Sequence, residues 1–173
     1  MSSSSNFIYP NNGVPHSKTK VNSAPQADVQ NSRVKIKNAV ITSQENLTDD
    51  TFLLTVKLDN NEVLNSHAGQ YGTLKVDELD KPRAFSFAKS PTSEKKGEFS
   101  FFIKQVPGGL FSEYLKENRA GQKIVLSGPM GQFKIDESNE DMVCIAGGSG
   151  MSAINAIVEE AAYNKVKRNC YFF

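Results

Sequence analysis

Arg83-Ala84-Phe85-Ser86 is the stretch from which the fold of this chain is interpreted. It opens the segment Arg83 to Ala88, whose alternating apolar residues predict a β-strand. Successive side chains of a strand point to opposite faces, so Arg83 and Phe85 share one face and Ser86 lies on the other. The stretch therefore puts a cation, a flat aromatic ring and a hydroxyl at one end of a single strand.

These three groups suit a ligand that is partly anionic and partly a flat heteroaromatic ring. A guanidinium binds phosphate with its planar fork of N–H donors. An aromatic side chain packs on a second ring, and a hydroxyl can hydrogen-bond a ring nitrogen. A flavin dinucleotide combines these features. The same four residues also fit an ordinary edge strand, so the segments that follow decide between the two interpretations.

A glycine turn at Val106-Pro107-Gly108-Gly109 ends one predicted strand and opens a short helix, which we expect over 110–118 because its apolar residues fall on one face. The first N–H groups of a helix have no internal partners and can hold an anion, to which Ser112 could add a hydroxyl. A plain β-turn and an amphipathic helix, with Ser112 only capping, fit the same residues.

A second glycine turn, Gly147-Gly148-Ser149-Gly150, follows the apolar run 142–146 and precedes a helix predicted over 151–167. Strand, glycine turn and helix in this order bind dinucleotides, with the pyrophosphate at the start of the helix. The spacing differs from the usual G-x-G-x-x-G fingerprint, and a tight βα connection fits equally well. Between the two turns, Gly128 to Phe133 is predicted to be a plain loop.

In this order the four elements resemble the ferredoxin–NADP reductase superfamily, and above all the reductase components of bacterial multicomponent mono- and dioxygenases. The resemblance covers about 34–173. It implies that Arg83 holds the flavin pyrophosphate, that Phe85 stacks on the flavin where tyrosine is usual, and that Ser86 lies near the reactive flavin nitrogen. The implied cofactor-binding residues are Arg83, Ala84, Phe85, Ser86, Ile103, Lys104, Gly109, Leu110, Ser112, Gly147, Gly148, Ser149 and Gly150.

Short apolar segments alternate with turn residues through the first part of the chain. Strands are predicted at 34–41, 51–58, 70–76, 83–88, 98–105 and 122–127. Six short strands of this kind favour a six-stranded antiparallel β-barrel, because closure removes unpaired strand edges. We expect this barrel to be an FAD-binding domain over 33–136, preceded by a disordered N-terminal tail at 1–32.

The pattern changes after residue 136. A strand, a long helix and a second strand at 169–173 predict the start of a parallel βαβ nucleotide-binding domain over 137–173. One such unit cannot cover both faces of a parallel sheet. The sequence is therefore expected to be truncated at its C-terminal end, with an incomplete NAD(P)-binding domain.

Composition restricts the kind of protein. The chain has 173 residues, 38% of them hydrophobic, and a formal net charge of +1, with no basic stripe that would indicate nucleic-acid binding. Its two cysteines, Cys144 and Cys170, lie in apolar runs and are interpreted as small hydrophobic residues in preference to a disulfide or a metal-binding pair. Two cysteines cannot hold a thiolate-ligated iron–sulfur cluster. No run is apolar enough for a membrane span, and a cytoplasmic location is expected.

The resemblance implies a flavin-dependent oxidoreductase that passes electrons from NAD(P)H through FAD to an iron–sulfur protein or oxygenase component. FAD and NAD(P)H are the expected cofactors, and no metal ligand or catalytic acid, base or nucleophile is predicted. Two alternatives stay open. One is a flavin-binding module that does not turn over NAD(P)H, and the other is an interaction barrel without a cofactor.

Overall fold

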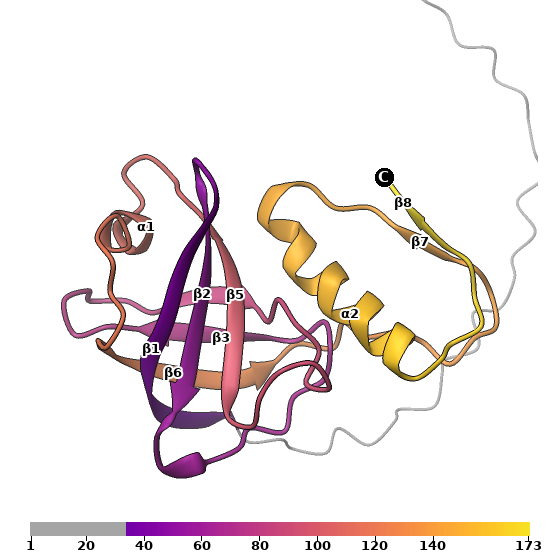
Figure 1. Cartoon of the computed structure of the whole chain (residues 1–173), viewed down its shortest axis with the longest axis horizontal. Helices are drawn as coiled ribbons and strands as arrows, with labels where there is room; N and C mark the ends of the chain where they lie inside the picture. Colours follow the sequence, from indigo (N-terminus) through magenta and orange to yellow (C-terminus); the bar gives the residue numbers. More distant parts are fainter. Residues whose placement is uncertain (1–33) are drawn as a thin grey trace, which may run out of the picture. The chain divides into compact units, whose positions relative to one another are not determined.

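The structure is a computed structural model, and it describes residues 34–173 of the chain. Six strands form one sheet with the order β4-β3-β6-β1-β2-β5, in which every neighbouring pair is antiparallel. This sheet curls into the predicted antiparallel barrel (Figure 1). The predicted tail at 1–32 lies outside the described residues. The strands are β1 (Lys35–Thr48), β2 (Thr51–Leu58), β3 (Tyr71–Lys75), β4 (Arg83–Ser86), β5 (Glu98–Lys104) and β6 (Lys123–Met130).

The barrel core is clearest in β2, where buried and less buried residues alternate. In β2 every second residue from Phe52 to Leu58 is buried, because a strand of period two points one face inward. Side chains from several strands meet inside, and each fully buried aliphatic or aromatic side chain contributes about 1.5–3 kcal/mol. The fully buried large side chains of this core include Ile41, Leu54, Leu74, Phe101, Ile103 and Leu126.

Strand β1 is longer than the predicted segment 34–41. It continues to Thr48, because Ser43–Thr48 pairs with β2 after a register shift that follows Ile41. The extra residues are mostly polar and lack the alternation that marks a strand. Pairing with β2, and not local preference, places them in the sheet.

The prediction of a plain loop at Gly128 to Phe133 is wrong for its first three residues, which belong to β6. Gly128 pairs with Lys35 of β1, and Met130 pairs with Tyr71 of β3. The pairing of β6 with β3 shifts its register between Met130–Tyr71 and Ser127–Thr73, and Pro129 lies within this shift. Proline is tolerated at such an irregularity because no ladder hydrogen bond requires its missing N–H.

Both α-helices end earlier than predicted. Helix α1 (Leu110–Tyr114) stops well before residue 118, because other side chains bind its last carbonyls: Arg119 Nε donates to the Tyr114 carbonyl at 2.7 Å. Helix α2 (Met151–Tyr163) stops before residue 167, where Lys165 adopts a positive φ of 53°. A positive φ cannot continue a right-handed helix. Two short 3-10 turns, η1 (Asp59–Asn61) and η2 (Gly148–Gly150), complete the elements.

The C-terminal part has the predicted strand–helix–strand order. Strand β7 (Met142–Cys144) pairs in parallel with β8 (Cys170–Phe172), and α2 connects them. This confirms the start of a parallel βαβ unit. Among the described residues, no helix has the length and apolar character needed to cross a membrane.

Candidate cofactor site

The barrel is open along one line, between its two edge strands. β4 and β5 are the ends of the sheet order and do not pair with each other. They meet where the Ala88 N–H donates to the Ser100 carbonyl at 2.8 Å. We call the unpaired facing edges of β4 and β5 beyond this bond the seam. Unpaired strand edges present N–H and C=O groups to whatever lies against them.

Arg83 begins the β4 edge of the seam. It pairs through its backbone with Leu74 of β3. Its side chain is half-buried, and Nη1 donates to the Pro82 carbonyl at 3.2 Å. Within residues 34–173, the Arg83 guanidinium forms no salt bridge. A guanidinium without an acidic partner is available to bind a phosphate through two parallel N–H donors.

The ring of Phe85 has protein neighbours on the barrel side. Its centroid lies 5.2 Å from that of Phe111 and 6.5 Å from that of Phe101. The side chain packs on the edge of the core but is only half-buried, so part of the ring stays exposed. Such a ring forms a fixed apolar wall at the seam, and its exposed part can pack on a second ring.

Ala84 and Ser86 alternate with Arg83 and Phe85 along β4. Ala84 is exposed and Ser86 half-buried. The Ser86 hydroxyl has no hydrogen bond with a described side chain or backbone group, which leaves both its donor and its acceptor capacity for a ligand.

The β5 edge ends at Ile103 and Lys104. The Ile103 side chain is 1% exposed and belongs to the core, so only its backbone can face a ligand. Lys104 is exposed, and its Nζ lies 3.2 Å from Asp50 Oδ2. Hydrogen bonds from Thr51 and Thr48, followed by that of Lys104, lower the pKa of Asp50. Lys104 therefore already has an acidic partner, unlike Arg83.

The first glycine turn holds Gly109, Leu110 and Ser112. The Ser112 hydroxyl is buried and lies 3.1 Å from both the N–H and the carbonyl of Val106 and 2.9 Å from the Gly109 carbonyl. A Cβ on Gly109 would lie 2.8 Å from Ser112 Oγ, so the turn needs glycine there. These contacts favour the alternative in which Ser112 stabilises the turn. Leu110 is 58% exposed.

The second glycine turn lies beside the end of β5. Gly147, Gly148, Ser149 and Gly150 are all exposed. Gly148 has a left-handed φ of 54°, and a Cβ there would lie 3.9 Å from Lys104 Cδ. Glycine adopts this conformation without steric cost. The fold therefore brings two predicted site segments, far apart in the sequence, to one end of the seam.

Helix α2, which follows this turn, is held on the segment after β4. Asn155 Nδ2 donates to the Ala88 carbonyl at 2.7 Å, and Glu159 Oε2 accepts from the Ser90 N–H at 2.9 Å. A small apolar contact of Ala68, Ala156 and Ile157 adds to these bonds. The predicted nicotinamide-side helix and the predicted flavin strand are thus joined by specific hydrogen bonds.

Tyr71 is a candidate that the sequence interpretation missed. Its backbone pairs with Ser86 of β4 on one side and with Met130 of β6 on the other. Its half-buried ring lies against Gly131, where a Cβ would be 3.1 Å from Tyr71 Cδ1. A tyrosine at the start of a predicted strand carries no signal by itself. Only the pairing of β3 with β4 shows that Tyr71 lies beside the predicted site residue Ser86.

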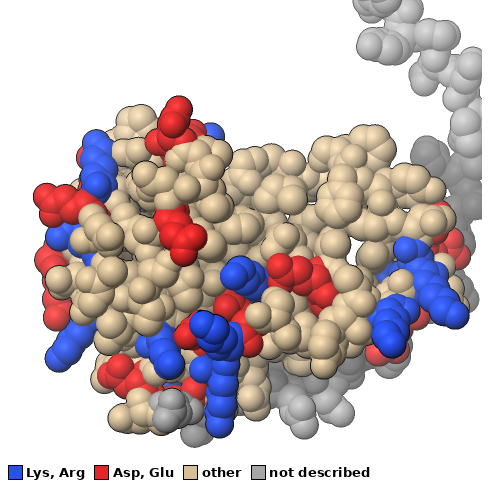
Figure 2. Space-filling view, viewed as in Figure 1, with Lys and Arg blue, Asp and Glu red and all other residues tan. Residues whose placement is uncertain are grey.

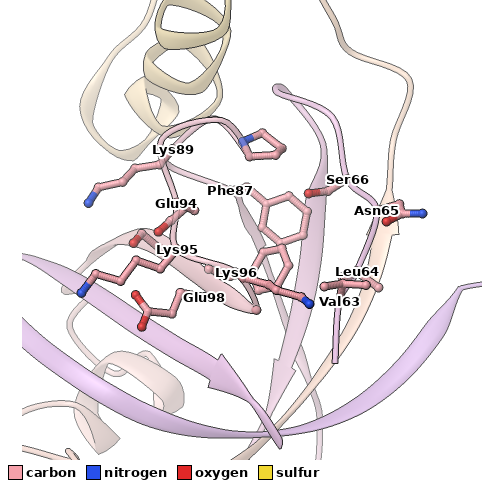
Figure 3. A pocket seen from close by; sticks show the side chains of 14 residues that line it. Val63, Leu64, Asn65, Ser66, Phe87, Lys89, Glu94, Lys95, Lys96 and Glu98 are labelled. Carbon is pink, nitrogen blue, oxygen red and sulfur yellow. The ribbon is translucent and has the colours of Figure 1, made fainter. Parts of the chain in front are cut away.

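A cavity of about 440 Å³ lies at the other end of β5, beside Glu98, Phe99 and Ser100. None of the predicted site residues lines it. Figure 3 shows the ring of Phe87 in this cavity, between Ser66 on one side and Glu94 on the other. Burial raises the pKa of Glu94, against weaker opposing hydrogen bonds from Ser100. The seam combines unpaired strand edges with a guanidinium that has no acidic partner among residues 34–173, and it is the better candidate for a cofactor site.

Charges of both signs are interspersed on the face of the molecule that Figure 2 shows. Residues 34–173 contain no group of three or more His, Cys, Asp or Glu side chains placed to hold a metal ion. The chemistry of the described site is therefore that of one free guanidinium, hydroxyls, aromatic rings and backbone groups.

Residues 38–135 match the family model described as the oxidoreductase FAD-binding domain, which is more than half of the chain. The chain is 33% identical over 137 residues to the xylene/toluene monooxygenase electron transfer component of Pseudomonas putida, covering 79% of this chain and 38% of the relative. It is 34% identical to the toluate 1,2-dioxygenase electron transfer component of Pseudomonas putida, covering 72% and 36%.

Among solved structures, the ferredoxin reductase in carbazole 1,9a-dioxygenase is similar, with a TM-score of 0.72 and 31% identity over 81% of this chain and 42% of that one. The chain thus spans about two-fifths of the length of these relatives. The matched residues 38–135 contain all six barrel strands except the first residues of β1, together with both edges of the seam. The chain belongs to the oxidoreductase FAD-binding domain family.

Proposed function

We propose that the chain binds FAD at the seam and passes electrons from NAD(P)H through FAD to an iron–sulfur protein or oxygenase component. The family match over residues 38–135 supports the FAD part of the proposal. The relatives named as electron transfer components of oxygenase systems support the acceptor. A further relative, the ferredoxin–NAD(P)(+) reductase component of the naphthalene 1,2-dioxygenase system of Pseudomonas putida, supports the donor. Because the chain covers about two-fifths of their length, the complete reaction is a proposal for this chain.

The observation that carries the proposal is the Arg83 guanidinium, which has no acidic partner among residues 34–173, on the edge strand of an open barrel. FAD has a doubly charged pyrophosphate and a flat polar ring. The donor set of the seam fits both parts, because Arg83 can bind phosphate oxygens and the free backbone edges can hydrogen-bond the ring. The residues present therefore suit the cofactor that the family name implies.

When bound, FAD supplies the two-electron and one-electron chemistry that protein side chains lack. The chain would bind and orient it. Arg83 would offset the pyrophosphate charge, Phe85 would form an apolar wall for the ring, and Ser86 would donate or accept a hydrogen bond at a ring nitrogen. Ala84, which is exposed and small, would leave room beside the edge.

The remaining predicted residues would complete the contacts. The backbone of Ile103 and Lys104 would line the β5 edge, and Gly109, Leu110 and Ser112 would form the second phosphate turn. The turn at Gly147–Gly150 would receive NAD(P)H beside the flavin, because it lies next to Lys104. We assign the FAD-binding domain to 33–136 and the start of the NAD(P)-binding domain to 137–173. A cytoplasmic location belongs to the same proposal, since NAD(P)H is held inside cells.

The test is anaerobic reduction of the FAD-loaded chain. The purified protein is incubated with FAD, freed of unbound cofactor and mixed with NADH or NADPH while the flavin absorbance near 450 nm is recorded. Bleaching by either nucleotide supports the whole proposal. If the flavin is bound but only dithionite bleaches it, the chain is a flavin-binding module that does not turn over NAD(P)H. If the chain retains no flavin, the alternative of an interaction barrel without a cofactor is supported.

A further inference from the structure

We propose that Cys144 and Cys170 form a reversible disulfide when the protein meets hydrogen peroxide. The two Sγ atoms lie 3.5 Å apart although 26 positions separate the residues in the sequence. Both thiols are free. The proposal goes beyond the cofactor site, since neither cysteine is part of the seam. The sequence places the two in separate apolar runs, so their proximity is a product of the fold.

The pairing of β7 and β8 explains the proximity. Met142 pairs with Cys170, and Cys144 pairs with Phe172. Alternate residues of a strand share a face, so Cys144 and Cys170 are diagonal neighbours on one face of the two-stranded sheet. The strand register therefore places the two side chains on the same face, within reach of each other.

A disulfide requires the two sulfur atoms to approach to about 2.05 Å, which is about 1.5 Å closer than in the reduced pair. Strand β8 can make this small movement. It has only three residues, and Tyr171 and Phe172 are about half exposed on opposite faces. Few packed contacts oppose a shift of β8 toward β7.

The two thiols differ in access and in acidity. Cys144 is 6% exposed and Cys170 is half-buried, so peroxide meets Cys170 first. Burial, and then the neighbouring Cys170 thiol, raise the pKa of Cys144. A protonated, buried thiol is a poor first target for peroxide. It suits the second step, in which it meets an already oxidised sulfur.

The Cys170 sulfur attacks one peroxide oxygen, the O–O bond breaks, and the products are a Cys170 sulfenic acid and one water. The Cys144 sulfur then attacks the Cys170 sulfur, the S–O bond breaks, and the oxygen leaves with the Cys144 proton as a second water. Two thiols lose two electrons to one peroxide. A reducing dithiol restores both thiols by exchange and is itself oxidised to a disulfide.

The disulfide would join both ends of the segment that contains α2. Cys144 precedes Gly147 by three residues, so the cross-link would restrict the strand that leads into the second glycine turn. In reducing compartments, protein disulfides are mostly transient and report oxidation. The pair would thus make the βαβ unit more rigid when peroxide is present.

The experiment treats the purified chain, at low micromolar concentration, with increasing hydrogen peroxide. Free thiols are blocked with N-ethylmaleimide, and the tryptic peptides that contain Cys144 and Cys170 are analysed by mass spectrometry without reductant. We expect both thiols to be lost together, one cross-linked peptide pair within a monomer, and recovery of two alkylated thiols after dithiothreitol. The matched variant Cys144→Ser should instead leave a Cys170 sulfenic acid that dimedone traps.

Three results would overturn the proposal. The first is independent oxidation of each cysteine to sulfinic or sulfonic acid with no cross-linked peptide. The second is a disulfide only between two chains. The third is equal dimedone trapping in the wild type and in Cys144→Ser, because a nearby Cys144 thiol must shorten the life of the sulfenic acid. None of these readouts depends on bound FAD or on its reduction.

Discussion

The Ala88 N–H donates a hydrogen bond to the Ser100 carbonyl at 2.8 Å, and this bond joins the segment directly after β4 to the other edge strand, β5. Beyond it, toward Arg83 and Lys104, β4 and β5 are unpaired. The bond therefore fixes where the seam begins. It also separates the seam from the cavity at the other end of β5, which Ser100 helps to line.

Replacing Arg83 with alanine should weaken FAD binding about 10- to 150-fold. Its guanidinium has no acidic partner among the described residues, so it is free to make charge-assisted hydrogen bonds, each of about 1.5–3 kcal/mol. Quenching of flavin fluorescence on titration measures the affinity. Arg83→Lys should give an intermediate value, because lysine keeps the charge but loses the planar fork. The exposed Lys81→Ala is the control, and an equal loss there would contradict a specific role for Arg83.

Ser112→Ala should lower the stability of the FAD-free protein by about 1–2 kcal/mol, since its buried hydroxyl bonds Val106 and Gly109. Urea unfolding measures this. Ser86→Ala is the matched variant, because the Ser86 hydroxyl has no partner among the described residues. It should leave stability unchanged and weaken FAD binding about 3- to 10-fold. The reverse pattern, with Ser112→Ala changing only affinity, would assign Ser112 to the cofactor.

Phe85→Ala should destabilise the FAD-free protein by about 2 kcal/mol. The ring is half-buried and packs on Phe111 and Phe101, so its loss costs part of the 3–5 kcal/mol typical of a fully buried phenylalanine. Phe85→Tyr keeps these contacts and should stay within about 0.5 kcal/mol of the wild type. Unfolding curves recorded without FAD isolate this effect. An unchanged unfolding midpoint for Phe85→Ala would contradict a contribution of the Phe85 ring to core packing.

The stability of the folded chain should decrease as the pH rises above about 4.5, through the titration of Glu94. Burial raises the folded-state pKa of this carboxyl above its unfolded value of 4.5, so the folded state binds the proton more tightly and loses that advantage at higher pH. Asp50 and Asp136 act in the opposite direction: their lowered pKa values mean that stability is lost as the pH falls below about 3.8.

Glu94→Gln isolates the first effect, because an amide cannot ionise. Urea unfolding of both proteins between pH 4.5 and 7.5 should give a decline for the wild type that the variant lacks. Parallel curves for the two proteins would mean that Glu94 titrates alike in the folded and unfolded chains.

Asn155→Ala should loosen α2 from the barrel. The lost bond from Asn155 Nδ2 to the Ala88 carbonyl is worth about 1 kcal/mol. Hydrogen exchange of residues 151–163 should therefore accelerate about fivefold, while exchange in β1 and β2 stays the same. Uniform acceleration across the barrel would indicate global destabilisation and would contradict a local contact.

The barrel could be predicted from the sequence because most of its strands have a residue pattern that indicates a strand without reference to their neighbours. Alternation in β2 and β5 requires no knowledge of neighbours. The polar half of β1 lacks such a signal, since its pairing with β2 alone puts Ser43 and Thr48 in the sheet. Gly128 and Pro129 even indicate a loop, and only their place between β1 and β3 makes them part of a strand.

The candidate site was predictable where residues are close in sequence and not where the fold joins them. Arg83 and Ser86 lie on one predicted strand, so their proximity follows from the strand prediction alone, although their side chains point to opposite faces. Tyr71 joins them only through β3–β4 pairing. The contacts of Ser112 with Val106, like the proximity of the two cysteines, depend on a turn and on a strand register that no single motif encodes.

The most direct test of the account is a crystal structure of the chain grown with FAD. We predict that pyrophosphate oxygens lie within hydrogen-bond distance of the Arg83 guanidinium and that the flavin ring lies along the unpaired edges of β4 and β5. Density for FAD in the cavity beside Phe99, with Arg83 still facing solvent, would contradict it.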